Sequence, residues 1–425
     1  MLTTVFFRYL GTLLQFVVLA VIARSVSVED YGIYMMCLSV TFSFYYVSGF
    51  GTSESGLAHL SRNRALEKEE GNGQIVGTVM GTTLACAAVL LCAAVIVYVL
   101  QPFAERTTNT AAIFILVFLS AAGIIFNVSQ LLLGLGYSAV GSFFFYPAIN
   151  LTLLFSTVPT ALILSDVHFV NLSIATSLGA CVAACVALFS VRRLTRALSH
   201  SWSFAQCKTL IYEGVGLTGV RILHVSSFWI PTMVTGFILA PALAGEMGTA
   251  GRIAIAVSAV IAAVRFFIRP AINRALATAD MVELRRMLGS VAFITTSAGL
   301  LALIANEMVG EEVISFFFGQ DLASASMTLT VLLLSVCAEA VFGPVDELLK
   351  ANGQQKVVAW IYGIGVPFFL LGSILMANLG LIWIAWFQVV YVLGIFSAMN
   401  YVVYCKFGFA VFPLIPNLSE IRNLR

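Results

Sequence analysis

A succession of about twelve long apolar runs constrains this chain more than any other feature. The first run, from Thr3 to Ala23, contains about twenty mostly apolar residues, and similar runs follow along the whole sequence. A helix of that length crosses the ~30 Å hydrocarbon layer of a membrane at ~1.5 Å per residue. Hydrophobic residues make up 60% of the 425 positions and charged residues only 10%. We therefore expect an all-α polytopic membrane protein with about twelve transmembrane helices.

The expected spans are joined by short connections. The longest outer loop is expected at 307–321 and the longest inner connections at 53–74 and 192–212. The first run is too long for the apolar part of a cleaved signal peptide, so we expect it to be retained. The spans are expected at 3–23, 31–52, 75–100, 110–134, 142–164, 169–191, 213–238, 245–268, 287–306, 322–343, 355–377 and 380–404.

The basic residues are distributed very unevenly between the two sides of this map. Of the 22 Lys and Arg residues, sixteen lie in one set of connections and only Arg24 and Arg106 lie in the other. Cytoplasmic loops are the ones enriched in Lys and Arg. The asymmetry therefore predicts that both termini are cytoplasmic.

An internal repeat divides the sequence near residue 200. Leu119, Phe126 and Gly136 match Leu334, Phe342 and Gly353 at an offset of about 216 residues. Each half has an even number of spans, so the two halves enter the membrane in the same orientation. We therefore expect two six-helix lobes, 1–200 and 201–425, related by a parallel pseudo-twofold repeat. The second lobe ends in a short amphipathic cytoplasmic tail, 412–425.

One arginine lies inside the first apolar run. Arg8 is followed by Gly11, Thr12 and Gln15, which share its helix face. A charged residue at this depth is costly unless it faces a polar cavity or a partner. The alternative is that Arg8 reaches the lipid headgroups from near the end of the helix.

The internal repeat points to further candidate residues for a polar cavity. His224 is the counterpart of Arg8, and Arg221 lies within one turn of it. Arg252 lies about two turns inside the eighth span. We expect Arg8, Gln15, Arg221, His224 and Arg252 to line a substrate path between the lobes, although a buried histidine is more often a structural residue.

Several local patterns resemble a known family. They are Phe7-Arg8-x-Leu10-Gly11, Ile22-Ala23-Arg24, Glu29-Asp30-Tyr31-Gly32, Phe316-Phe317-Phe318-Gly319, and Gly343-Pro344 followed by Asn352-Gly353. The chain resembles the O-antigen and exopolysaccharide flippases of the multidrug/oligosaccharidyl-lipid/polysaccharide exporter superfamily. The resemblance implies two six-helix lobes that open alternately to each side of the membrane. It also implies cavity-lining arginines on the first and eighth helices, to which Arg8 and Arg252 correspond.

What the resemblance implies for function is the transport of a lipid-linked sugar. The cargo would be an undecaprenyl-diphosphate-linked oligosaccharide, moved from the inner to the outer leaflet of the bacterial cytoplasmic (inner) membrane for surface polysaccharide synthesis. The expected partners are this cargo, membrane lipids and the polysaccharide polymerase machinery. We expect a monomer that binds no nucleic acid and needs no cofactor beyond a coupling ion, proton or sodium.

Two other functions remain open from the sequence. An ion-coupled exporter of drugs or other small molecules needs a buried carboxylate, and Glu339 in the tenth span is the candidate for ion coupling or for pairing with an arginine. A membrane-embedded polysaccharide polymerase or ligase needs a large outer loop, which is not expected here. The sequence offers no catalytic triad or metal-ligand constellation, so we expect a non-enzyme. Gly71, Gly73 and Gly77 follow no strand and are not a phosphate-binding loop.

Overall fold

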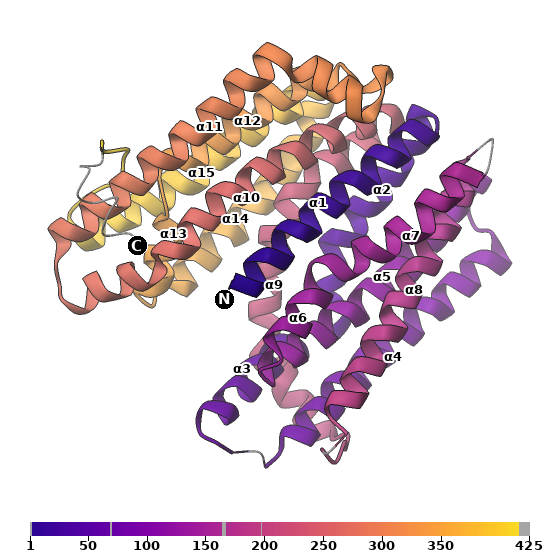
Figure 1. Cartoon of the computed structure of the whole chain (residues 1–425), viewed down its shortest axis with the longest axis horizontal. Coiled ribbons are helices and arrows are strands. Elements are labelled where there is room, and N and C mark those ends of the chain that lie inside the picture. Colours follow the sequence, from indigo (N-terminus) through magenta and orange to yellow (C-terminus); the bar gives the residue numbers. More distant parts are fainter. Residues whose placement is uncertain (1, 69, 164–166, 197, 416–425) are drawn as a thin grey trace. The chain divides into compact units, whose positions relative to one another are not determined.

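The computed structural model describes residues 2–68, 70–163, 167–196 and 198–415. Within these residues the chain forms fifteen α-helices joined by turns, with no strand. This confirms the expected all-helical membrane class. The helices divide between two compact units, Met1–Trp229 and Ile230–Arg425 (Figure 1).

The first unit is built around α5, a long helix that packs against α4, α8, α3 and α2. Helix α1 packs mainly against α7 and α6. The helices of this unit are α1 (Leu2–Ser25), α2 (Val28–Phe44), α3 (Thr52–Ala65), α4 (Asn72–Leu100), α5 (Arg106–Gly134), α6 (Ser138–Phe145), α7 (Pro147–Ile163), α8 (Phe169–Leu194) and most of α9 (Phe204–Val234), with a 3₁₀ turn, η1, at Tyr45–Gly49.

In the second unit, α12 packs against α10, α11 and α15. A π-helical turn, η2 (Thr235–Leu239), leads into it from α9. Its helices are α10 (Pro241–Ala277), α11 (Met281–Phe318), α12 (Ala325–Val341), α13 (Val345–Ala351), α14 (Gln355–Ala377) and α15 (Leu381–Phe407), with a 3₁₀ turn, η3, at Gln320–Leu322.

Eight helices in the described part of the chain are long and apolar enough to cross a membrane. Three further spans result if each bent pair of helices is counted as one, giving up to eleven. The pairs are α2 and η1 with α3, α6 with α7, and α12 with α13. The remaining expected span, 245–268, lies within the 37-residue helix α10.

The two halves share a distinctive turn at positions that the repeat equates. After α5, the N–H groups of Gly136 and Tyr137 donate to the carbonyls of Leu133 and Leu132, at 3.0 and 2.8 Å. After α13, Gly353 and Gln354 donate in the same way to the carbonyls of Lys350 and Leu349, at 3.1 and 2.8 Å. Both glycines have positive φ, +92° and +73°, the left-handed conformation that ends many helices.

The expected connections contain more helix than predicted. Residues 307–321, expected as an outer loop, belong mostly to α11, which ends only at Phe318 before Gly319 (φ +102°). The expected inner connection 53–74 contains α3, a polar helix. The outer loop expected at 307–321 was wrong, because apolar length identifies a span but not the polar helical turns that extend it.

The expected C-terminal tail is only partly described. Residues 409–415 are not helical, so the helical spacing from Leu414 onward is not realised there. The Leu414 N–H instead donates to the carbonyl of Gly289 in α11 (3.0 Å), and Asn400 of α15 exchanges two hydrogen bonds with Val411. Residues 416–425 lie outside the described part of the chain.

Glycines on α4 accommodate the segment that precedes α9. A Cβ atom at Gly73, Gly77 or Gly81 would clash with the backbone of Ser199, the backbone of Ser201 or the ring of Trp202, respectively. The spacing of four residues places the three glycines along one face of α4. The role of Gly73, Gly77 and Gly81 is therefore close packing. Two of them, Gly73 and Gly77, belong to the glycine motif that was not expected to bind phosphate.

The compact units divide in α9, just after Trp229. Leu210 of α9 belongs to the core of the first unit with Leu60, Val79 and Leu131. Pro231, which removes a backbone hydrogen bond, and the π-helical turn follow directly after the division. The lobe boundary expected near residue 200 concerns the repeat and stays a prediction.

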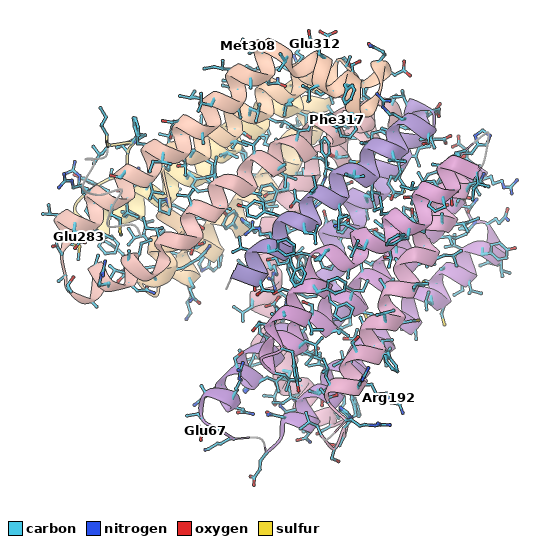
Figure 2. The ribbon with its side chains drawn as sticks, in the orientation of Figure 1. Glu67, Arg192, Glu283, Met308, Glu312 and Phe317 are labelled. Atoms are coloured by element: carbon cyan, nitrogen blue, oxygen red, sulfur yellow. The ribbon has the colours of Figure 1, made fainter. Side chains whose placement is uncertain are left out.

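The side chains follow the pattern expected in a membrane. In Figure 2, Glu67, in the loop after α3, and Arg192, near the end of α8, both lie toward the lower end of the first unit but on opposite sides of it. Along the helices between such ends, exposed residues are largely apolar, as at Val95 of α4 and Val182 and Phe189 of α8. Exposed apolar helix faces with polar ends suit a lipid environment.

Candidate functional site

The most distinctive polar feature of the first unit is an ion pair between α9 and α3. Arg221 Nη1 donates to Glu54 Oε1. The side chain of Glu54 is 13% exposed and that of Arg221 33% exposed. A charge pair withdrawn from water in this way is costly to assemble, and removing one partner leaves the other uncompensated.

Aromatic rings surround the guanidinium of Arg221. Its Cζ atom lies 5.2 Å from the centroid of the Tyr46 ring, 5.3 Å from that of Phe126 and 5.8 Å from that of Phe145. These rings come from η1, α5 and α6, and Glu54 comes from α3, so four elements converge on the Arg221 side chain. Cation–π contacts at such distances stabilise a partly desolvated cation.

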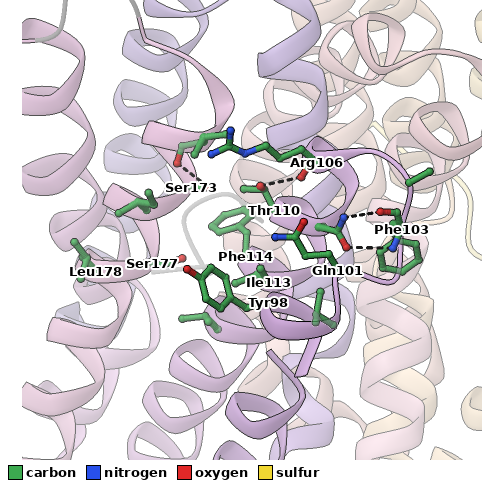
Figure 3. Close-up of a pocket in the computed structure, with 16 residues that line it drawn as sticks. Tyr98, Gln101, Phe103, Arg106, Thr110, Ile113, Phe114, Ser173, Ser177 and Leu178 are labelled. Atoms are coloured by element: carbon green, nitrogen blue, oxygen red, sulfur yellow. Dashed lines mark hydrogen bonds between the residues drawn. The ribbon is translucent and has the colours of Figure 1, made fainter. Parts of the chain in front are cut away.

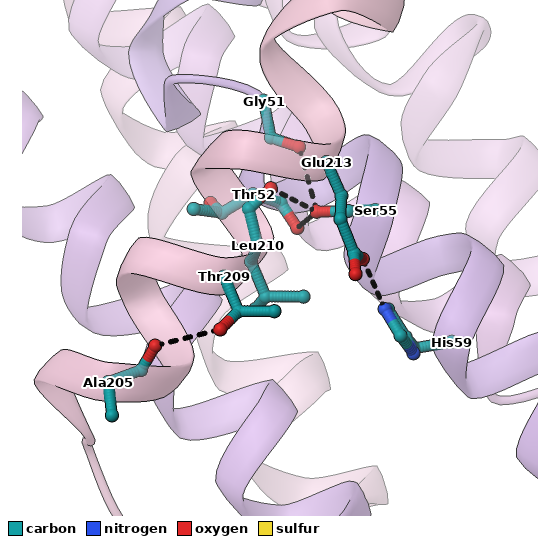
Figure 4. A network of polar contacts seen from close by, with 8 residues as sticks. All are labelled: Gly51, Thr52, Ser55, His59, Ala205, Thr209, Leu210 and Glu213. Atoms are coloured by element: carbon teal, nitrogen blue, oxygen red, sulfur yellow. Dashed lines mark hydrogen bonds and ion pairs between the residues drawn. The ribbon is translucent and has the colours of Figure 1, made fainter.

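Close backbone packing holds α9 against the start of α3. Gly51 (φ +87°) and Gly214 approach so closely that a Cβ on either would clash with the backbone of the other. The Ser55 hydroxyl donates to the Leu210 carbonyl (2.7 Å), and His59 Nε2 lies 2.6 Å from Glu213 Oε2. Figure 4 shows these contacts joining the two helices. They fix the register at which Glu54 meets Arg221.

Helix α1 is packed against the junction of α6 and α7. Gly11 lies against the backbone of Tyr146, and the Asn150 amide donates to the Gly11 carbonyl (3.1 Å). Near the start of α1, the hydroxyls of Thr4 and Ser142 lie 3.0 Å apart. Tyr146 in turn follows Phe145, whose ring contacts Arg221. Thus α1 and Arg221 reach adjacent residues of the same junction.

Arg8 itself lies one turn before Gly11 and is half-buried. Its carbonyl accepts from the Thr12 hydroxyl (3.1 Å). Within the described part of the chain, its guanidinium has no hydrogen-bond or ion-pair partner. The two arginines of the first unit therefore differ, because Arg221 is neutralised by a carboxylate and Arg8 is not.

The remaining expected site residues fall into two groups. Gln15 of α1 is half-buried, and His224 of α9 is exposed with its ring 5.5 Å from that of Phe228. Arg252 of α10 and Glu339 of α12, both half-buried, belong to the second unit, where those helices pack together. A single site containing all of these residues stays a prediction.

Sequence reasoning did not identify the partner of Arg221. Glu54 lies 167 residues before Arg221 in the sequence. Tyr46, Phe126 and Phe145 lie in apolar runs and look like ordinary core residues. Only the pairing of α3 with α9 in the fold reveals this set.

The arrangement is suited to binding an anion. An arginine carries five N–H donors, and Glu54 is the only hydrogen-bond partner of Arg221 among the described residues. The Thr218 hydroxyl, one turn earlier on the same face of α9, is buried with no partner among those residues. A guanidinium with free donors binds phosphate in a bidentate manner. In the described residues, no three His, Cys, Asp or Glu side chains form a group able to hold a metal.

Comparison with known proteins identifies a matching family. The model of the family described as "Polysaccharide biosynthesis protein" matches residues 2–275, well over half of the chain. No curated protein sequence matches.

Solved structures share the fold at low sequence identity. An inward-facing multidrug resistance MATE family transporter of the MOP superfamily aligns with a TM-score of 0.68 and 13% identity, covering 94% of each chain. The lipid II flippase MurJ in an inward closed conformation aligns with a TM-score of 0.67 and 13% identity, covering 95% of this chain and 86% of its own. The Vibrio cholerae MATE transporter VcmN aligns with a TM-score of 0.57 and 15% identity, covering 95% of both chains. The chain belongs to the polysaccharide biosynthesis protein family and has the fold of these membrane transporters.

Proposed function

We propose that this protein is a flippase, not an enzyme, and that it moves an undecaprenyl-diphosphate-linked oligosaccharide from the inner to the outer leaflet of the bacterial cytoplasmic membrane. The observation that carries the proposal is the pair of arginines in the membrane-spanning helices α1 and α9, in a chain of the polysaccharide biosynthesis family. An uncharged sugar would not need such residues. A diphosphate linkage carries negative charge, which arginine side chains can bind.

The two arginines would act in different ways on the headgroup. A diphosphate carries about two negative charges and binds guanidinium groups through charge-assisted hydrogen bonds. Arg8, which has no partner among the described residues, would take the first phosphate directly. Arg221 would exchange part of its contact with Glu54 for the second phosphate. The aromatic rings around Arg221 hold the guanidinium in place during this exchange.

The test is binding and transport by arginine variants. We expect Arg8→Ala and Arg221→Ala each to weaken binding of an undecaprenyl-diphosphate sugar by roughly 10–100-fold, equivalent to about 1.4–2.8 kcal/mol. The double variant should lose less than the sum, because both residues contact one ligand. Arg8→Lys and Arg221→Lys should keep partial function, since lysine retains the charge but not the planar fork.

Two measurements on the same variants make the test decisive. Binding is measured on purified protein, and surface-polysaccharide display is measured by complementation at matched expression. Arg192→Ala, which removes an exposed charge at the end of α8, serves as the control and should bind normally. Normal binding by the Arg8→Ala, Arg221→Ala double variant would overturn the proposal.

A specific observation also favours a second function, an ion-coupled exporter of small molecules. The TM-scores to the MATE transporter and to MurJ are nearly equal, and Glu54 is a mostly buried carboxylate. Glu339 in α12 is the proposed coupling group for a proton or sodium in either case. If Glu339→Gln abolishes the dependence of transport on an ion gradient while cargo binding survives, the coupling role stands. Export of a cationic dye with no binding of the diphosphate lipid would favour the exporter.

A further inference from the structure

A groove at one end of the first unit lies away from the arginines of α1 and α9. It has a volume of about 760 Å³ and lies between the end of α4, the start of α5 and the start of α8. Ile113, Phe114 and Val117 of α5 line it, and so does Phe103 of the loop between α4 and α5. Figure 3 shows Arg106 and Thr110 of α5 and Ser173 of α8 at one end of the groove, with Tyr98 and Ser177 farther along it. A volume of this size accommodates a small-molecule ligand.

The polar end of the groove carries a positive charge. Arg106, the first residue of α5, reaches across toward Ser173 of α8 (Figure 3). Its guanidinium has no hydrogen-bond or ion-pair partner in the part of the chain that the structure describes. The neighbouring Glu105 instead accepts, at 3.5 Å, from the hydroxyl of Thr108.

Polar side chains and helix ends accompany Arg106 in the groove. Gln101 and Ser177 line it, and so do Thr110 and Ser173, whose hydroxyls donate to the carbonyls of Arg106 (3.0 Å) and Val170 (2.8 Å). Both α5 and α8 begin here, and the first turn of a helix favours an anion through its free N–H groups and its dipole. The polar end is therefore built to receive a negatively charged or phosphate-bearing group.

The other end of the groove is apolar and continuous with the membrane-facing surface. Tyr98 of α4 and Ile174 and Leu178 of α8 line it and are all largely exposed. Beyond them, the same faces continue with exposed Val95 on α4 and Val182 on α8. An acyl chain could pass from the groove onto these faces without crossing a polar surface.

The groove lies where three spans end, which is the depth of lipid headgroups. By the distribution of basic residues, this is the outer side of the membrane, where Arg106 is one of only two basic residues. We propose that the groove binds an anionic phospholipid of the outer leaflet, with its phosphate on Arg106 and one acyl chain between α4 and α8. The site is independent of the proposed cargo path.

The test is native mass spectrometry of the purified full-length protein with phosphatidylglycerol. We expect Arg106→Gln to weaken binding of one phosphatidylglycerol by roughly tenfold, the loss of a charge-assisted contact worth ~1.4 kcal/mol. Ser177→Phe should weaken it similarly by filling the groove beside the apolar wall. Arg192→Gln removes a charge at the opposite end of α8 and should have no effect.

Two further probes separate a lipid site from a simple anion site. Phosphatidylcholine should bind more weakly than phosphatidylglycerol, and inorganic phosphate at the same concentration should not compete. If inorganic phosphate competes and Ser177→Phe has no effect, the groove binds a free anion and the proposal is wrong. Unchanged phosphatidylglycerol binding in both Arg106→Gln and Ser177→Phe would also overturn it. Both variants should retain the diphosphate-sugar binding of the unsubstituted protein.

Discussion

At the scale of single residues, Glu54 has two opposing effects on Arg221. Its carboxylate neutralises a guanidinium that is only 33% exposed, which stabilises the folded unit. The same carboxylate competes with any phosphate that approaches that guanidinium. A bound diphosphate would neutralise Arg221 in place of Glu54, and the Glu54 carboxylate would then be left without its cation.

Substitution of Glu54 therefore has a two-sided expected outcome. Glu54→Gln should lower the stability of the ligand-free protein by about 1–2 kcal/mol, below the ~3–5 kcal/mol typical of a fully buried pair. Added undecaprenyl-diphosphate sugar should then raise the melting temperature more in this variant than in the unsubstituted protein. Thermal unfolding in detergent, with and without the lipid, measures both effects.

Glu213→Gln provides a matched control for this experiment. Glu213 also joins α9 to α3, through His59, but its side chain is 45% exposed. A surface pair of this kind contributes little, about 0–1 kcal/mol. Equal behaviour of the two variants would show that the Glu54–Arg221 pair has no special role in ligand binding.

The sequence indicated that Arg8 and Arg221 lie within helices, but it did not indicate which residues they contact. Arg8 and Arg221 stand out in the sequence because charges are rare within apolar runs, and the structure places both within helices. The link from Arg221 to Glu54 depends on how α3 folds back onto α9, and no local pattern encodes it. The cationic groove at Arg106 was missed for a related reason, since Arg106 was considered only as a topology signal.

At the scale of helices, the contact between Gly51 and Gly214 determines where α3 crosses α9. A methyl group at Gly214 would meet the backbone of Gly51. Such a clash cannot be relieved by a side-chain rotation, so the helices would have to separate. Glu54 and Arg221 depend on that crossing for their contact.

Gly214→Ala should therefore destabilise the protein by about 1–3 kcal/mol, the cost of overpacking, and weaken cargo binding with it. Gly216→Ala and Gly219→Ala on the same helix are the controls, because a Cβ at either position meets nothing within 4 Å. They should be neutral or slightly stabilising, since alanine favours a helix over glycine. Thermal unfolding of the three variants decides the matter, and a stable, fully active Gly214→Ala protein would refute this role for the contact.

The sequence predicted apolar helices better than polar ones. Apolar runs identified spans such as 169–191, now α8 (Phe169–Leu194), within a few residues. Polar segments gave no such signal, so α3 was expected only as part of an inner connection and the last turns of α11 as an outer loop. The bend between α6 and α7 at Tyr146 was also unforeseen, although Pro147, which begins α7, is a residue type that commonly interrupts a helix.

At the scale of the whole molecule, topology is the first expectation to test. Reporter fusions at Arg62, Leu194 and Lys350 should report the cytoplasm, and fusions at Arg106 and Glu311 the opposite side. The reason is the concentration of basic residues on one set of helix ends. A cytoplasmic signal at Arg106 would reverse the side assigned to the groove, and an odd number of spans would contradict the parallel repeat.

The proposed function requires the cargo to reach the protein from the inner leaflet. A cargo made in the cytoplasm carries its diphosphate at the inner leaflet, and an intramembrane arginine provides a place for that headgroup away from water. The protein's fold is shared by drug exporters and by a lipid flippase, so fold alone does not choose between them. The ligand does.

The most direct test of this account is transport by the purified protein in liposomes. A fluorescent undecaprenyl-diphosphate oligosaccharide is placed in the membrane, and its appearance in the opposite leaflet is followed by quenching from outside. We predict rapid translocation by the unsubstituted protein, at least tenfold slower translocation by Arg8→Ala, Arg221→Ala, and no competition from a cationic dye. Equal rates in the two proteins, or transport of the dye in place of the diphosphate lipid, would contradict the account.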